Sequence, residues 1–184
     1  MKKNLLLSLT LILLMAATSC NKIKEATERD INITPDAVEF TMPKIISTTE
    51  LKVVDVAAPI DIDAMIKAKA DQFGVKNLRN VRITSLKLDI ISGMDDANNF
   101  ANIESLSAKI EATGQAALTI ASVANNPDVK AGTLVIPVTA GSTELKSYLT
   151  AGNFKYTLSF KARRVTDKEL RIRATATYQL TVGL

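Results

Sequence analysis

The sequence predicts a mainly β protein, an antiparallel β-sandwich of about eight strands with one or two short helices. Apolar and polar residues alternate along many short segments of the chain, as they do in a sheet that buries one face. Only two stretches have helical character, and strands and helices do not alternate regularly. Together these observations favour two packed antiparallel sheets over a parallel α/β fold.

Eight segments carry the strand pattern. In chain order they are residues 38–42, 51–56, 81–90, 106–112, 118–123, 134–138, 154–164 and 170–182. In segment 81–90 the apolar positions change from odd numbers to even numbers across Thr84 and Ser85. Such a phase change predicts a β-bulge at these two residues.

The last two strand segments are predicted to pair as a hairpin across the polar turn VTDKE. In the final segment the even-numbered residues from Leu170 to Val182 are apolar or alanine, whereas the odd-numbered ones are Arg, Thr or Gln. We expect the even-numbered side chains to lie in the core and the odd-numbered ones to face solvent.

Two stretches have helical character. In IDIDAMIKAKADQFG, Asp61 or Asp63 is suited to cap the start of a helix that runs to Phe73, and Gly74 is suited to end it. A second, shorter helix is predicted in STELKSYLTAG, with Ser142 as its N-cap. Three of its side chains are expected to dock on the sandwich: Leu145, Tyr148 and Leu149.

Residues 1–19 are typical of a secretory signal peptide. The chain starts MKK, which is positively charged, and continues with an apolar run at residues 5–17. This run is shorter than the roughly 20 residues of a membrane-spanning helix. It ends in the small residues ATS, directly before Cys20.

The segment ATSC resembles the lipobox at which bacterial lipoproteins are cleaved and lipidated, with Ala17 where the common lipobox has Leu. The resemblance implies cleavage before Cys20, a thioether-linked diacylglycerol on that cysteine and a further acyl chain, such as palmitate, on its amino group. Two chains anchor a protein stably. Cys20 is the only cysteine, so the chain forms no internal disulfide. The alternatives are a secreted protein cut near Ala17 and an uncleaved anchor.

The remaining chain is predicted to be a tether followed by one domain. Residues 20–35 comprise the lipidated cysteine and a segment that mixes both charge signs and lacks aromatic residues, as a flexible tether does. Residues 36–184 have the size of one β-sandwich domain. Asn21 stands where the familiar enteric sorting rule requires Asp for retention at the inner membrane. The resemblance therefore implies the outer membrane, and the leaflet stays open.

The order of SLKLDI, NF, IESLSAKIEA and ELKSYL, followed by two final strands, resembles that of Gram-negative envelope lipoproteins with immunoglobulin-like sandwich domains. It resembles more distantly the sandwich of late-embryogenesis-abundant proteins. The resemblance covers roughly residues 81–184 and implies an immunoglobulin-like β-sandwich. It carries no catalytic signature, and a fold alone does not imply a reaction.

The composition argues against catalysis. The chain has no histidine, and its one cysteine is expected to be blocked by lipid, which excludes Ser-His-Asp and Cys-His systems and the common zinc sites. No GxGxxG or GxxxxGK[ST] loop is present. The carboxylate pairs that remain lie at a predicted helix cap and in turns: Asp61 with Asp63, Asp95 with Asp96, and Asp167 with Glu169. We expect no enzymatic activity and no cofactor.

The segment SGMDDANNF places four oxygen-bearing side chains in one loop: Asp95, Asp96, Asn98 and Asn99. Such oxygen ligands suit calcium. The spacing is not that of an EF-hand loop, and Asp, Asn and Gly are the usual residues of any turn. We expect a structural loop, with a calcium site as the alternative.

Four basic residues are expected to form a cationic strip on the predicted C-terminal hairpin: Lys161, Arg163, Arg171 and Arg173. A strip of this kind suits anionic lipid headgroups or an acidic partner. Basic side chains also serve simply to keep a strand face solvated and to block edge pairing. Nucleic acid is not expected as a partner, because aromatic residues do not alternate with the basic ones.

These observations predict a non-enzymatic outer-membrane lipoprotein whose sandwich is a structural or protein-interaction module. Its expected partners are the membrane, through the lipid on Cys20, and another envelope protein or a lipid. The alternatives are a binder of a lipid or other small apolar ligand, and a calcium- or glycan-binding module. A wide cavity between the sheets would favour the lipid binder.

Overall fold

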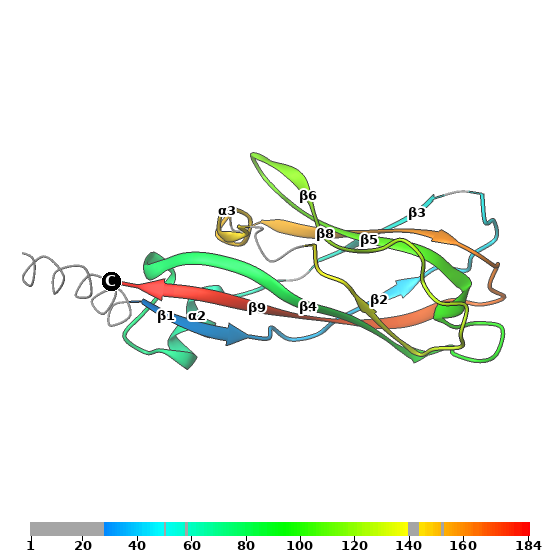
Figure 1. Ribbon diagram of the computed structural model, residues 1–184, viewed down its shortest axis with the longest axis horizontal. Helices are drawn as coiled ribbons and strands as arrows, with labels where there is room; N and C mark the ends of the chain where they lie inside the picture. The colour runs from blue at the N-terminus through cyan, green and yellow to red at the C-terminus, as the bar shows by residue number, and fades with distance from the viewer. Residues whose placement is uncertain (1–27, 50, 58, 140–143, 152) are drawn as a thin grey trace, which may run out of the picture.

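The computed structural model describes residues 28–49, 51–57, 59–139, 144–151 and 153–184. In this part of the chain nine strands form two antiparallel sheets, and short helices lie in the connections. Figure 1 shows the two sheets stacked as layers along the length of the molecule. The predicted antiparallel β-sandwich is confirmed, with nine described strands in place of about eight.

The first sheet has five strands in the order β1-β9-β4-β7, with β2 also paired to β9. Its strands are β1 (Glu28–Ile33), β2 (Val38–Met42), β4 (Leu78–Ser92), β7 (Thr133–Ile136) and β9 (Leu170–Gly183). β1 pairs with the C-terminal part of β9, and β2 pairs with its N-terminal part. The two short strands therefore share one long edge of β9.

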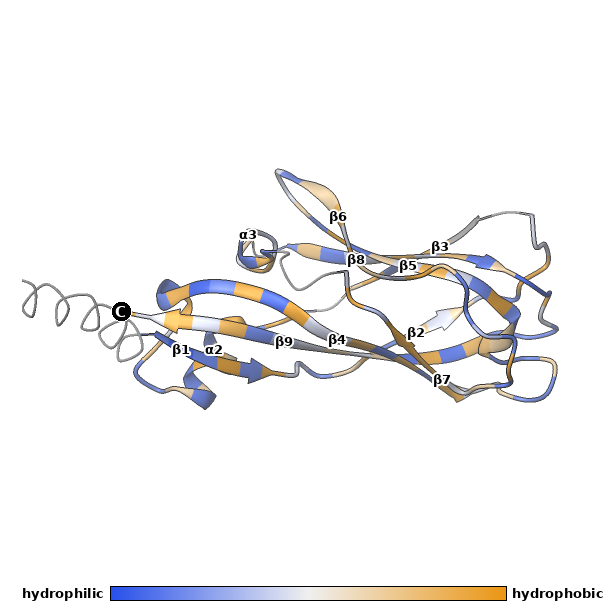
Figure 2. Cartoon of the chain, in the orientation of Figure 1, coloured by the Kyte–Doolittle hydropathy of each residue, from blue (hydrophilic) through white to orange (hydrophobic). Residues whose placement is uncertain are grey.

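The second sheet has four strands in the order β3-β8-β5-β6. They are β3 (Leu51–Val56), β8 (Phe154–Ala162), β5 (Ile103–Ala112) and β6 (Gln115–Val123). Figure 2 shows hydrophobic and hydrophilic residues in turn along the strands, which is the two-faced pattern of a sheet with one buried side. The core lies between the two sheets.

The predicted β-bulge is confirmed. The pairing of β4 with β9 shifts register between Ile83 and Ser85. On either side of this shift, Ile83 and Leu86 are both buried, although they are three residues apart. The extra residue thus returns the apolar side chains to the core face.

The two ends of the sandwich differ. We call the end at which β1 begins the proximal end. There Glu28 of β1 pairs with Gly183 of β9. At the opposite end, which we call the distal end, four connecting segments meet (Figure 1). They are residues 43–49, 93–102, 124–132 and 163–169.

The helices agree with the sequence in position and differ in length. Helix α2 (Ile62–Lys69) is capped by Asp61, as predicted, but it ends at Lys69 and not at Phe73. Phe73 is still buried, because the chain turns back on the sandwich after the helix and forms a short 3-10 helix, η1 (Val75–Asn77). Helix α3 (Lys146–Leu149) docks the three predicted side chains. Its proposed cap, Ser142, lies outside the described residues.

The predicted C-terminal hairpin is wrong. β8 pairs with β3 and β5, whereas β9 pairs with β1, β2 and β4 of the other sheet. Alternation along a strand reveals which side chains face the core, but not which strand is the neighbour. The connection at residues 163–169 is long enough to cross the roughly 10 Å between packed sheets.

The predicted tether is too long at its C-terminal side. Within residues 20–35, residues 28–33 form β1, which buries Ile31 and Ile33 against the core. Two apolar residues are too few to reveal a strand by alternation alone. The pairing with β9 makes this segment part of the sandwich, so the described part of the domain begins at Glu28.

Candidate functional site

Cys20, the predicted lipidation site, lies outside the described residues. The first described strand begins eight residues later, at Glu28 of the proximal end. The C-terminus lies at the same end (Figure 1). Because eight residues span at most about 28 Å, the proximal end is the part of the sandwich held close to Cys20.

Asp95 and Asn98 fasten the 95–99 loop to the connection between β8 and β9. Asp95 Oδ1 accepts hydrogen bonds from the backbone N–H groups of Ala97 and Asn98, both at 2.9 Å, and from Asn98 Nδ2 at 2.8 Å. The buried Asn98 side chain also donates to Asp167 Oδ1 at 2.6 Å and accepts from the Asp167 backbone N–H at 3.0 Å. Lys168 Nζ lies 2.5 Å from Asp95 Oδ2. Hydrogen bonds from Lys168 and Asn98 lower the pKa of Asp95 to about 2.

The other two candidates of this loop are also engaged within the protein. The buried Asn99 accepts a hydrogen bond from the Ala101 N–H at 3.0 Å and caps the short helix η2 (Phe100–Asn102). Asp96 is exposed and forms an ion pair with Lys130. Within the described residues, no group of three or more His, Cys, Asp or Glu side chains is placed to hold a metal ion. Calcium binding stays the untested alternative; in this structure the loop joins the distal segments.

The four basic candidates lie on both sheets and do not form the predicted strip. Arg171 and Arg173 project outward from β9 in the first sheet and share one carboxylate, Glu39 of β2. Each contact measures 2.8 Å between guanidinium nitrogen and carboxylate oxygen. The pKa of Glu39 is lowered, chiefly by the hydrogen bond from Arg173. These two arginines therefore link β9 to its neighbour β2.

The other two basic candidates belong to β8 and its exit. Lys161 projects outward from the second sheet and pairs with Glu104 at 2.9 Å. Arg163 donates from Nη1 to the Ala101 carbonyl at 2.8 Å and from Nη2 to the Asn126 carbonyl at 2.7 Å. Arg163 therefore joins three distal segments, and contact of the four residues with an anionic partner stays a prediction.

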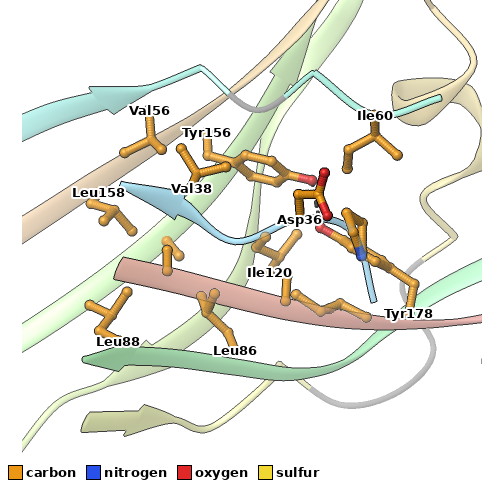
Figure 3. A pocket seen from close by; sticks show the side chains of 15 residues that line it. Asp36, Val38, Val56, Ile60, Leu86, Leu88, Ile120, Tyr156, Leu158 and Tyr178 are labelled. Carbon is orange, nitrogen blue, oxygen red and sulfur yellow. Dashed lines mark hydrogen bonds between the residues drawn. The ribbon is translucent and has the colours of Figure 1, made fainter. Parts of the chain in front are cut away.

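A small apolar cavity of about 50 Å³ lies between the sheets (Figure 3). It is lined by three alanines where larger side chains would fill the space: Ala108, Ala174 and Ala176. Ligand pockets measure about 300–1,000 Å³, and an apolar cavity that holds benzene measures about 150 Å³. Within the described residues, this cavity between the sheets is too small for an acyl chain.

An open hollow of about 960 Å³ borders this cavity beside α2 and α3. The two spaces share Asp36 and Ile60 as lining residues. The hollow is lined by apolar side chains of both helices together with three carboxylates: Asp36, Asp61 and Asp63. It is a feature of the molecular surface and lies outside the packed core.

Tyr156 of β8 and Tyr178 of β9 join the two sheets across the cavity, with their hydroxyl oxygens 2.5 Å apart (Figure 3). Burial raises the pKa of Tyr178 to about 12. Burial, together with the neighbouring Tyr178, also raises the pKa of Tyr156 well above its usual value. Both phenols therefore stay protonated at neutral pH, and their hydrogen bond links the two sheets within an apolar core.

The raised tyrosine pKa values predict a loss of stability at alkaline pH. An unfolded tyrosine ionises near pH 10, whereas folded Tyr178 keeps its proton up to about pH 12. Between these values the native state binds more protons, so stability falls as pH rises. We expect the wild type to lose about 2–3 kcal/mol more than Tyr156→Phe/Tyr178→Phe between pH 8 and pH 11, because both tyrosines contribute. Urea unfolding followed by circular dichroism at both pH values measures the difference; equal losses would contradict the expectation.

Two buried asparagines of the distal end were not among the sequence candidates. Asn102 donates from Nδ2 to the Ala97 and Val165 carbonyls at 2.9 and 3.0 Å. Asn126 donates to the Phe100 and Ile103 carbonyls at 2.7 and 3.0 Å. The available signal was an asparagine among apolar residues, as in FANI, since a buried amide needs hydrogen-bond partners.

The chain matches no known protein family and has no significant match among curated proteins. Among the described residues, no helix has the length and apolar character to span a membrane. The link to envelope lipoproteins therefore depends on the signal and lipobox residues of the sequence itself.

Proposed function

We propose that the chain is a non-enzymatic lipoprotein of the bacterial outer membrane, held by lipid on Cys20, whose β-sandwich is a protein-interaction module. The difference between the two ends of the sandwich is the observation that supports the proposal. The chain enters at the proximal end, eight residues after Cys20, and four connecting segments meet at the distal end. Loops on a rigid scaffold are the usual location of binding residues.

The carboxyl groups support a role without catalysis. A general acid at neutral pH needs a raised carboxyl pKa. Among the described residues, every carboxyl group with a resolved shift has a lowered pKa: Glu39, Asp63, Asp89, Asp95 and Asp128. In each case the largest cause is a hydrogen bond from a basic side chain. These carboxylates act as partners of Lys and Arg.

The small size of the cavity between the sheets favours the interaction module over the binder of a lipid. A lipid needs a continuous apolar space, and the cavity between the sheets measures about 50 Å³. The larger hollow beside α2 and α3 is open to solvent and carries carboxylates. The first space is too small for a ligand pocket, and the second is too open.

The proposal is tested by separating inner membrane, outer membrane and soluble fractions of cells that make the wild type, Cys20→Ala or Asn21→Ala. We expect the wild type and Asn21→Ala in the outer membrane, because both retain the cysteine that receives lipid. We expect Cys20→Ala to be absent from that fraction, since it cannot form the thioether. Outer-membrane recovery of Cys20→Ala at the wild-type level would overturn the proposal.

A further inference from the structure

The four segments of the distal end are fastened to one another. The Thr166 N–H donates to the Ile45 carbonyl at 3.0 Å, and the Ile45 N–H donates to Thr166 Oγ1 at 2.8 Å. The Phe100 N–H donates to the Ala131 carbonyl at 3.0 Å. Together with the hydrogen bonds of the Asn98, Asn102 and Asn126 side chains, these contacts link all four segments. A surface ordered in advance loses little conformational entropy when it binds.

Each distal segment exposes one large hydrophobic side chain. They are Ile46, Met94, Val129 and Val165, which are 74%, 41%, 67% and 55% exposed. Single exposed hydrophobic residues are normal on protein surfaces. Here, however, four of the eight such residues in the described chain belong to one end, one from each segment, while the others lie on separate elements: Val53, Val75, Val135 and Leu184.

The described charges of the distal end are equal in number, and most of the basic residues are paired with acidic residues of the same end. Its described segments contain five basic residues, Lys44, Lys130, Arg163, Arg164 and Lys168, and five acidic residues, Asp95, Asp96, Asp128, Asp167 and Glu169. Four of the basic residues form ion pairs with acidic residues of the same end. A nucleic acid or an anionic lipid surface is attracted by unpaired basic charge. The balanced end instead matches an uncharged surface.

We propose that the distal end is a docking surface for a folded protein partner that presents an uncharged, apolar recess to Ile46, Met94, Val129 and Val165. The inference rests on the proposed function for its orientation. The fourteen residues of β9 span about 45 Å, so an anchor at the proximal end holds the four side chains away from the anchoring membrane. Copies in one membrane point the same way, so their distal ends do not face each other.

The test replaces Ile46, Val129 and Val165, one at a time, by p-benzoylphenylalanine in the full-length chain, with irradiation of the cells that make it. The matched control places the same photoreactive residue at Val135, which is 63% exposed but lies on β7, outside the distal segments. We expect all three distal positions, and not position 135, to crosslink the same protein. Crosslinks to no common protein, to lipid or to a second copy of the chain would overturn the proposal.

The crosslinked protein, once identified by mass spectrometry, is purified and titrated with the wild-type chain. Val129→Ser/Val165→Ser is expected to weaken binding at least tenfold, because buried aliphatic anchors dominate such interfaces. Val135→Ser is expected to leave the Kd within about twofold. Equal affinities of the wild type and the distal variant would refute the docking surface.

Two further measurements separate the possible failures. Flotation of full-length Cys20→Ala, which carries no lipid of its own, with vesicles of phosphatidylcholine and phosphatidylglycerol tests direct lipid contact. Vesicle binding that is lost when Val129→Ser/Val165→Ser is added to Cys20→Ala would overturn the proposal of a protein partner. Fractionation of the irradiated cells tests the anchor. A chain absent from the outer membrane contradicts the proposed function, whereas an anchored chain without specific crosslinks contradicts only the docking surface.

Discussion

Gly93→Ala is expected to destabilise the domain by about 3 kcal/mol. Gly93 follows β4 with a φ of +89°, a conformation that costs an L-residue about 1–2 kcal/mol. A Cβ at this position would also lie 2.6 Å from the Glu169 backbone carbonyl and 3.1 Å from Leu170 Cδ2. The start of β9 would have to move, which would strain the distal network. Urea unfolding of both proteins measures the difference.

Gly114→Ala is the matched control. Gly114, in the turn between β5 and β6, also has a positive φ, +76°, but an added Cβ would meet no atom within 4 Å. This variant should lose only the backbone contribution, about 1 kcal/mol. Equal losses in the two variants would mean that the approach of residues 93 and 169 does not constrain the fold.

Asn126→Ala is expected to lower the free energy of unfolding by about 2 kcal/mol. The Asn126 side chain is 6% exposed and donates to the Phe100 and Ile103 carbonyls. Alanine removes both donors and leaves buried acceptors with unmet hydrogen bonds, each worth about 1–3 kcal/mol if no water replaces them. The connection at residues 124–132 should therefore loosen together with η2, and faster amide hydrogen exchange in both segments would report it.

Asn125→Ala provides the control at the neighbouring position. Asn125 is exposed, so its replacement by alanine should change stability by no more than about 0.5 kcal/mol. The two variants share the same change in composition and the same loop. A similar loss in both would assign the effect to the loop backbone and contradict the role of the buried amide.

Alternation along the chain predicted much of the fold. The last strand is the clearest case, because Leu170, Ile172, Leu180 and Val182 are all buried, as the pattern requires. The bulge in β4 was predictable for the same reason, since a change of phase has few other causes. Local patterns of this kind depend on side-chain direction, which the backbone geometry fixes.

The wrong predictions concern the pairing of strands that lie far apart in the sequence. The choice of β4 as the long neighbour of β9 depends on packing of the whole sandwich, and neither strand carries a local signal for it. β1 was missed because only Ile31 and Ile33 reveal it, and their burial requires β9, which lies nearly 150 residues later. A short strand without tertiary context resembles a tether.

The sequence identified several residues of the candidate site, but it did not predict the contacts between them. The loop of Asp95 to Asn99 was correctly predicted to be a loop, yet its bonds to Asp167 and Lys168 depend on the crossing of the chain between sheets. Arg163 was predicted to face solvent on the final hairpin, and its guanidinium instead binds carbonyl groups of two other segments. Both roles follow from topology, which the alternation pattern does not contain.

The most direct test of the anchored-lipoprotein account is the intact mass of the native protein purified from the outer membrane. The account predicts a polypeptide that begins at Cys20 and carries the added mass of a diacylglyceryl group and one further acyl chain. Protease digestion should place this mass on the peptide that contains Cys20. An unmodified chain that begins at another residue, or one that retains residues 1–19, would contradict the account.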